Sequence, residues 1–94
     1  MKFDFNPTKN ELLFSTRGVS FPQVIEALAK NGLLYDIPHP NTDAYPNQRI
    51  FVVRLDSYTY CVPYVLENNI CFLKTIYPSR KFHQIVKGDK YEDK

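Results

Sequence analysis

The apolar residues of this 94-residue chain change their spacing near its middle, and this change limits the folds that the chain can form. Before the loop at 39–48, apolar side chains recur every three or four residues, as they do on one face of a helix. From residue 49 to residue 77 the helical spacing is lost and the period is two, which is typical of strands. A helical segment followed by a run of strands indicates an α+β protein.

The first helix is predicted over about 7–17. The Asn6 side chain can accept hydrogen bonds from the first backbone N–H groups of a helix. Pro7 suits the first helical position because it has no N–H to leave unpaired. Gly18 follows the last residue of the pattern and is predicted to end this helix.

The second helix is predicted over about 21–31, with Gly32 as its stop. Ser20 and Gln23 form the S-x-x-Q pattern of a capping box, in which each side chain binds a backbone N–H at the start of the helix. The apolar residues of this segment fall at helical spacing and form one stripe that is expected to be buried, consisting of Phe21, Val24, Ile25 and Leu28.

Three strands are predicted after the loop, at 49–55, 58–66 and 70–77, joined by tight turns. A short strand over 33–37 would add a fourth. Pro63 cannot donate to a neighbouring strand, so a bulge is predicted there. A last helix is predicted from Ser79. The prediction is therefore a single α+β domain over residues 1–94, with two N-terminal helices packed on an antiparallel meander of three to four strands and a short C-terminal helix.

The two turns assign every strand residue to a face of the predicted sheet. If both are two-residue loops, Leu55 pairs with Tyr58 and Glu67 pairs with Ile70. The face predicted to pack on the helices carries Ile50, Val52, Cys61, Val65, Ile70, Phe72 and Ile76, with Arg54 and Lys74. The opposite face is predicted to be an aromatic and basic surface, and it carries Arg49, Phe51, Val53, Tyr58, Tyr60, Val62, Tyr64, Leu73, Thr75 and Tyr77, with Arg80 just beyond it.

The two cysteines are predicted to be free thiols. The same register separates Cys61 and Cys71 by about five residues along neighbouring strands, or roughly 16 Å, whereas a disulfide needs Cα atoms within about 7 Å. The absence of a Cys-x-x-Cys pattern and the presence of only two histidines argue against a zinc site. No apolar run approaches the about 18 residues of a membrane span, and no signal peptide is visible. The expected location is the cytoplasm.

The charges are distributed unevenly along the chain. Residues 1–48 carry four basic and five acidic side chains, whereas residues 49–87 carry six basic and only two acidic ones. The basic half is also rich in tyrosine, a combination that suits a polyanion with bases that can stack. A solvated sheet face with ordinary charges explains the same composition.

The sequence contains no pattern of a P-loop, a Gly-rich nucleotide turn, a carboxylate pair or a Ser-His-Asp set. Metal-free RNA cleavage is the reaction that these absences leave open. The RNA supplies its own nucleophile, the 2′-OH, so the protein has only to orient the strand and stabilise the charge on the phosphate. No cofactor is expected. The candidate catalytic residues are Arg49 and Arg80, which would hold the phosphate, and His83, which would act as a general acid. The candidate substrate-binding residues are Tyr60, Tyr64, Tyr77 and Lys81.

Several short segments resemble the BrnT family within the RelE-like ribonuclease toxins. FDFNPTKN at Phe3–Asn10 resembles the opening of that family, which has an aromatic-rich strand followed by a helix cap. RGVSF at Arg17–Phe21 resembles its K-H-G-V-S-F signature. NQR at Asn47–Arg49 resembles its G-E-R, and Thr75–Lys81 resembles its I-I-S-A-R-R-A. Two helices, a meander of strands and a basic terminal segment also form the layout of this group.

The resemblance implies a type II toxin that cleaves RNA and is neutralised by a cognate DNA-binding antitoxin, with the ribosome as a further candidate partner. Arg49 matches the arginine of the family's G-E-R, and Arg80 matches the second arginine of its R-R pair. The chain departs from the family at four positions. Arg17 replaces a histidine, Gln48 a glutamate, Tyr77 a serine and Ser79 the first arginine of the pair.

A non-catalytic protein is the alternative interpretation. In that case the tyrosine-rich sheet face would be an interface. It would bind either RNA or another protein, and in the second case this chain would be a structural subunit of a complex. Tyr and Arg dominate the hot spots of protein interfaces, so composition alone does not separate a nuclease from a binding module.

Overall fold

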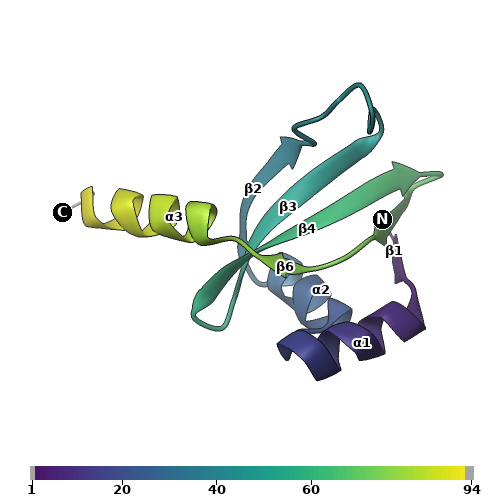
Figure 1. Cartoon of the computed structure of the whole chain (residues 1–94), viewed down its shortest axis with the longest axis horizontal. Helices are drawn as coiled ribbons and strands as arrows, with labels where there is room; N and C mark the ends of the chain where they lie inside the picture. The colour runs from purple at the N-terminus through teal and green to yellow at the C-terminus, as the bar shows by residue number, and fades with distance from the viewer. Residues whose placement is uncertain (1, 93–94) are drawn as a thin grey trace.

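The computed structural model describes residues 2–92. In chain order the elements are β1 (Lys2–Phe5), α1 (Pro7–Arg17), α2 (Phe21–Ala29), β2 (Leu33–Pro38), β3 (Gln48–Leu55), β4 (Tyr58–Glu67), β5 (Ile70–Leu73), β6 (Tyr77–Pro78) and α3 (Arg80–Glu92). The strands form one sheet in the order β1-β5-β4-β3-β2, and β6 also pairs with β4. Figure 1 shows α1 and α2 together beside the sheet, and α3 extending away from it. The α+β class is therefore confirmed.

The sheet is larger than predicted and is mixed rather than antiparallel. It has six strands, and β1 lies parallel to β5, with Lys2 opposite Ile70 and Phe5 opposite Leu73. The four predicted strands do form an antiparallel meander, β2 to β5, but the predicted count of three to four omits β1 and β6. With only four residues, β1 is too short to show a clear alternation, and it is paired by a strand far away in the sequence. The family resemblance implied an aromatic-rich strand here, and β1 occupies that position.

Both N-terminal helices begin where the sequence predicts. The Asn6 side chain accepts hydrogen bonds from the backbone N–H groups of Thr8 and Lys9, and Gly18 ends α1 in the left-handed region at φ 71°. At the start of α2, Ser20 and Gln23 make both bonds of the capping box. Local capping chemistry therefore determines where these helices start.

The end of α2 differs from the prediction. The helix stops at Ala29, and the left-handed residue that follows is Asn31, at φ 66°, rather than Gly32. Gly32 serves a different purpose, because a Cβ at this position would lie 2.8 Å from the Cβ of Ala27. Its missing side chain lets the chain turn back closely against α2 and enter β2.

Both predicted hairpin registers are confirmed. Leu55 lies opposite Tyr58, and Glu67 lies opposite Ile70. Asn68 and Asn69 both have positive φ angles, as a two-residue type I′ turn requires. The predicted bulge is also present, since the chain leaves the sheet after Leu73 and returns at Tyr77 with its pairing to β4 shifted by one residue.

The bulge lies opposite Pro63. Lys74 N–H donates to the Pro63 carbonyl at 2.8 Å, and Pro63 has no N–H with which to complete the pair. The single predicted strand over 70–77 is therefore two strands, β5 and β6.

The face assignment is wrong for every residue of the predicted core face except Ile76, which the bulge after Leu73 brings into the main core. The helices pack on the face that was predicted to be the aromatic and basic surface, and Tyr64 there is only 5% exposed. The buried residues of this main core are Leu13, Val19, Phe21, Val24, Phe51, Val53, Leu55, Val62, Tyr64, Cys71, Leu73 and Ile76. Alternation shows which residues share a face, but β3 and β4 are apolar on both faces, so it does not show which face the helices cover.

The second face of the sheet has a smaller core. Ile50, Val52 and Cys61 are buried there under Phe82 of α3, together with side chains of β2. The central strands are therefore covered on both sides, by α1 and α2 on one and by the start of α3 on the other. No helix among residues 2–92 is long and apolar enough to cross a membrane.

Both cysteines are buried and free, as predicted. Cys61 lies opposite Tyr77, whereas Cys71 lies opposite Leu66, five positions further along β4. The two thiols also belong to different cores, one on each face of the sheet.

Candidate functional site

The structure separates the predicted site residues into two groups. Tyr60, Tyr77, Arg80, Lys81 and His83 lie around the start of α3, whereas Arg49 and Tyr64 pair with each other near the start of β3. Arg80 follows β6, whose Pro78 pairs with Tyr60, four positions from Tyr64 along β4 and thus about 13 Å away. The structure therefore does not bring Arg49 and Arg80 together, and Arg49 contacts Tyr64 and Asp36 instead.

The start of α3 is fixed by Ser79. Its side-chain hydroxyl accepts a hydrogen bond from Phe82 N–H at 3.2 Å, and its carbonyl accepts one from His83 N–H at 3.0 Å. Ser79 N–H in turn donates to the Thr59 carbonyl at 3.0 Å, which attaches the helix start to β4. Ser79, one of the four departures from the family pattern, is therefore the cap of α3.

Arg80 and Lys81 are exposed on the first turn of α3. Cations at a helix N-terminus oppose the helix dipole, at a cost of a few tenths of a kcal/mol each. They do not stabilise the helix there. Two exposed cations at the positive end of the helix dipole instead form a surface that attracts an anion.

His83 is held by two residues of β4. Its Nδ1 lies 3.1 Å from the hydroxyl oxygen of Thr59, and its ring stacks on Tyr58 with the centroids 4.1 Å apart. Thr59 is completely buried. With Nδ1 engaged, Nε2 is the nitrogen left to exchange a proton with a substrate. Sequence reasoning missed Thr59 and Tyr58, because only the packing of α3 brings them to His83.

Tyr77 and Tyr60 flank this group. Tyr77 is 37% exposed, and Tyr60 is half-buried against the main core. Burial, followed by the neighbouring Cys61 thiol, raises the pKa of Tyr77, so its hydroxyl stays protonated near neutral pH. Tyr77 can therefore donate a hydrogen bond or stack on a base, but it is not a general base.

Arg49 belongs to a second polar cluster, with Asp36 and Tyr64. Its Nε donates to Asp36 Oδ1 at 3.2 Å, and its Nη2 donates to the Asp36 carbonyl at 3.1 Å. The Tyr64 hydroxyl donates to the same Oδ1 at 2.8 Å. Asp36 thus organises both predicted residues, and sequence reasoning missed it because the partners come from three different strands.

The titration behaviour of this cluster follows from its geometry. Burial, together with the carboxylate of Asp36, raises the pKa of Tyr64 to about 12. The Tyr64 hydroxyl and then Asp36 raise the pKa of Arg49, so the guanidinium remains charged. The Tyr64 ring also stacks on Phe51 with the centroids 3.8 Å apart. The ring of Tyr64 therefore belongs to the core and is not a platform on which a base can stack.

A pocket of about 470 Å³ opens beside this cluster. Apolar side chains from α2 and four strands line it, namely Phe3, Leu28, Leu33, Phe51 and Leu66, and Asp36, Arg49 and Tyr64 supply its polar groups. Leu33 and Leu66 are exposed at its rim.

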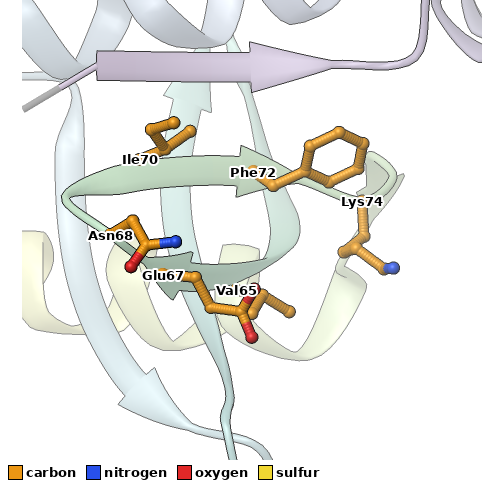
Figure 2. Close-up of a pocket in the computed structure, with 6 residues that line it drawn as sticks. All are labelled: Val65, Glu67, Asn68, Ile70, Phe72 and Lys74. Atoms are coloured by element: carbon orange, nitrogen blue, oxygen red, sulfur yellow. The ribbon is translucent and has the colours of Figure 1, made fainter.

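The opposite face of the sheet carries a separate pocket of about 320 Å³ near the β4–β5 hairpin. Figure 2 shows the six residues that line it, Val65, Glu67, Asn68, Ile70, Phe72 and Lys74. The Lys74 ammonium lies 5.6 Å from the centroid of the Phe72 ring. Val65, Ile70 and Phe72 were predicted to be core residues, but α3 covers only the other end of this face, so they remain half-buried or exposed.

Arg17, which stands where the family has a histidine, has a structural contact. Its guanidinium donates to the carbonyl of Ile76 and so attaches the end of α1 to the segment between β5 and β6. Gln48 begins β3, and its backbone carbonyl accepts from His39 N–H at 3.1 Å. Among the side chains that the structure describes, those of residues 2–87, there is no group of three or more His, Cys, Asp or Glu that could hold a metal ion.

Fold and side chains define this chain as an α+β protein with a capped, basic helix start and a pocket on the opposite face of its sheet. Comparison with protein-family models, with curated proteins and with solved structures finds no match to the chain. What the chain does is therefore inferred from its own residues and their geometry.

Proposed function

We propose that this chain is a metal-free endoribonuclease whose reaction takes place at the start of α3, and that it acts in the cytoplasm as the ribonuclease toxin of a type II toxin–antitoxin system. The observation that carries the proposal is the position of His83. Its Nδ1 is bound to Thr59 and its ring lies on Tyr58, one turn after two exposed cations, Arg80 and Lys81.

The chemistry assigned to these residues balances without a metal. The 2′-oxygen of RNA attacks the adjacent phosphorus, and its proton passes to solvent. Arg80 and Lys81 stabilise the negative charge that grows on the phosphate oxygens. The bond to the 5′-oxygen breaks, and that oxygen takes a proton from His83. The products are a 2′,3′-cyclic phosphate and a free 5′-hydroxyl, and Tyr77 is available to stack on a neighbouring base.

The toxin assignment rests on the resemblance and on the layout of the chain. An aromatic-rich strand, two helices, a meander of strands and a terminal basic helix form the order implied by a RelE-like arrangement. A cognate DNA-binding antitoxin and the ribosome remain the proposed protein partners. Arg49, although it matches the family pattern, lies outside the proposed cleavage site.

A non-catalytic RNA-binding protein is the second candidate. It can no longer use the tyrosine-rich sheet face, because α1 and α2 cover Phe51, Val62 and Tyr64 there. One observation favours it at the start of α3, where the hydrogen-bond partner of His83 is a hydroxyl rather than a carboxylate. A site with cations and a single imidazole can hold RNA without cleaving it.

RNA cleavage in EDTA tests the proposal. Wild type, His83→Gln and Arg80→Gln are compared on one RNA, with Lys30→Gln as a control that removes an exposed cation directly after α2. We expect 2′,3′-cyclic phosphate ends from wild type and Lys30→Gln, and rates about 100-fold lower for His83→Gln, as expected when a general acid is lost. Equal rates for wild type and His83→Gln would exclude this mechanism, whereas salt-dependent RNA binding without products would establish the binding protein.

A further inference from the structure

We propose that the pocket beside Arg49 binds a small organic acid with an apolar body, its carboxylate on the Arg49 guanidinium and its body against Phe51 and the surrounding leucines. This ligand site is separate from the proposed cleavage site and does not depend on RNA chemistry. The proposed cleavage at the start of α3 assigns no role to Arg49 and Tyr64. The ligand site gives these two predicted site residues a common role.

The size and the lining of the pocket suit such a ligand. Its volume of about 470 Å³ lies within the range of roughly 300–1,000 Å³ that small-molecule sites occupy. Five apolar side chains face a few polar groups in it, which is the usual composition of such sites. The wall is built by a helix and four strands of the core, so the cavity does not depend on a loop.

Arg49 is already oriented for an anion. Asp36 accepts from Nε and, through its backbone carbonyl, from Nη2. A guanidinium carries more N–H donors than these two bonds use, and its planar fork matches a carboxylate. The side chain is therefore partly immobilised before a ligand arrives, which lowers the entropic cost of binding.

Asp36 does not exclude an acidic ligand. Its Oδ1 accepts hydrogen bonds both from Arg49 and from the Tyr64 hydroxyl, so its charge is compensated on the protein side. The pKa of Tyr64 is about 12, so the phenol remains a donor to Asp36 and adds no negative charge to the pocket. A ligand carboxylate can then bind to the outer N–H groups of Arg49, with the guanidinium between the two carboxylates.

The pocket in Figure 2 provides the internal comparison. It is also partly apolar and also has one cation, but Lys74 is an exposed ammonium on a flexible chain, and Glu67 lies in the same lining. An ammonium has no planar fork with which to bind both oxygens of a carboxylate. An acid that binds only through apolar contacts would bind in either pocket. An acid whose carboxylate needs an oriented guanidinium would bind only in the pocket beside Arg49.

Decanoate is the probe, and decanol of equal chain length is its neutral counterpart. Titration of the full chain is followed by two-dimensional NMR of the backbone amides, with wild type, Arg49→Gln and Lys74→Gln in parallel. We expect saturable one-to-one binding of decanoate, with shifts at Asp36, Arg49 and Leu66. Affinity should fall about tenfold or more in Arg49→Gln, in line with the loss of a charge-assisted hydrogen bond, and should be unchanged in Lys74→Gln.

A second variant keeps the test decisive if Arg49→Gln alters the fold. Leu66→Glu places an acid at the rim, where the native side chain is 48% exposed, and leaves the Arg49–Asp36 pair in place. It should weaken decanoate more than decanol. Equal affinity for decanoate in wild type and both variants would overturn the proposal. So would decanol binding as tightly as decanoate, shifts confined to the pocket with Lys74, or no saturation at millimolar decanoate.

Discussion

Asp36 and Tyr64 show how one carboxylate can determine the properties of a small polar cluster. Asp36 Oδ1 accepts from both the Tyr64 hydroxyl and Arg49 Nε, while the ring of Tyr64 packs on Phe51 in the main core. A hydroxyl that is bound to a carboxylate in a buried position resists ionisation. The stability of the core therefore depends on pH through the Tyr64 hydroxyl.

Removal of the Tyr64 hydroxyl tests this connection. Tyr64→Phe should lower the free energy of unfolding by about 1 kcal/mol at pH 8, since one hydrogen bond is lost. An unfolded tyrosine ionises near pH 10, whereas the native pKa is about 12. The contribution of the hydroxyl is therefore complete below about pH 10 and is lost as the pH rises toward 12, because the unfolded state releases its proton first.

Urea denaturation of both proteins at pH 8, 10 and 11 measures the effect. The difference in unfolding free energy between wild type and Tyr64→Phe should shrink as the pH rises. The other tyrosines and both thiols are present in the two proteins, so their titration cancels in the difference. A difference that stays constant from pH 8 to pH 11 would contradict a raised pKa at Tyr64.

At the scale of elements, short polar signals decide where each helix begins. Asn6, Ser20 and Ser79 cap α1, α2 and α3 respectively, and each side chain accepts from backbone N–H groups of the first turn. The cap of α3 has an additional role, because it also attaches the helix to β4 through Thr59. The position of His83 therefore depends on the cap as well as on the packing of Phe82.

The two serine caps form a matched pair for mutation. Ser79→Ala and Ser20→Ala each remove one capping hydroxyl and should each lower the unfolding free energy by about 1 kcal/mol. Only Ser79→Ala should speed hydrogen exchange at Phe82 and His83 selectively and reduce RNA cleavage, because only that cap precedes the proposed site. Equal effects of the two variants on cleavage would show that the start of α3 has no special part in the reaction.

At the scale of the whole molecule, the sheet is covered unequally. α1 and α2 bury the face that carries Val62, whereas α3 covers only part of the other face and leaves the region around Val65 and Phe72 open. Figure 1 shows why, since α3 extends away from the sheet rather than across it. The sheet thus has one closed face with a pocket at its edge, and one half-open face with a smaller pocket.

Two valines on opposite faces of β4, Val62 and Val65, test which face of the sheet the helices cover. Val62 is completely buried, and Val65 is half-buried on the open face. Threonine has nearly the shape of valine, so the substitution adds only a hydroxyl. Val62→Thr should cost about 1–3 kcal/mol of unfolding free energy, because that hydroxyl is buried without a partner, and Val65→Thr should cost under about 0.5 kcal/mol. If urea denaturation showed a larger loss for Val65→Thr than for Val62→Thr, it would contradict the packing of the helices on the face that carries Val62.

Local chemistry accounts for the part of the fold that the sequence by itself determined. Caps at Asn6 and Ser20, two-residue turns at 56–57 and 68–69, and a bulge opposite Pro63 act over a few residues, and all were predicted. Arg49, Tyr64, Arg80 and His83 were also predicted to be site residues. Their types and positions could be read directly from the chain.

Only the tertiary structure decided the features that depend on distant segments. β1 pairs with a strand more than sixty residues away, and the helices pack on one of two apolar faces. Arg49 contacts a residue of β2, and His83 contacts residues of β4. The physical reason is that alternation fixes side chains relative to one another along a strand but not relative to the rest of the molecule. Total burial, summed over all elements, selects the face, and with that choice it places the pocket beside Arg49 and the helix start at His83 on different sides of the sheet.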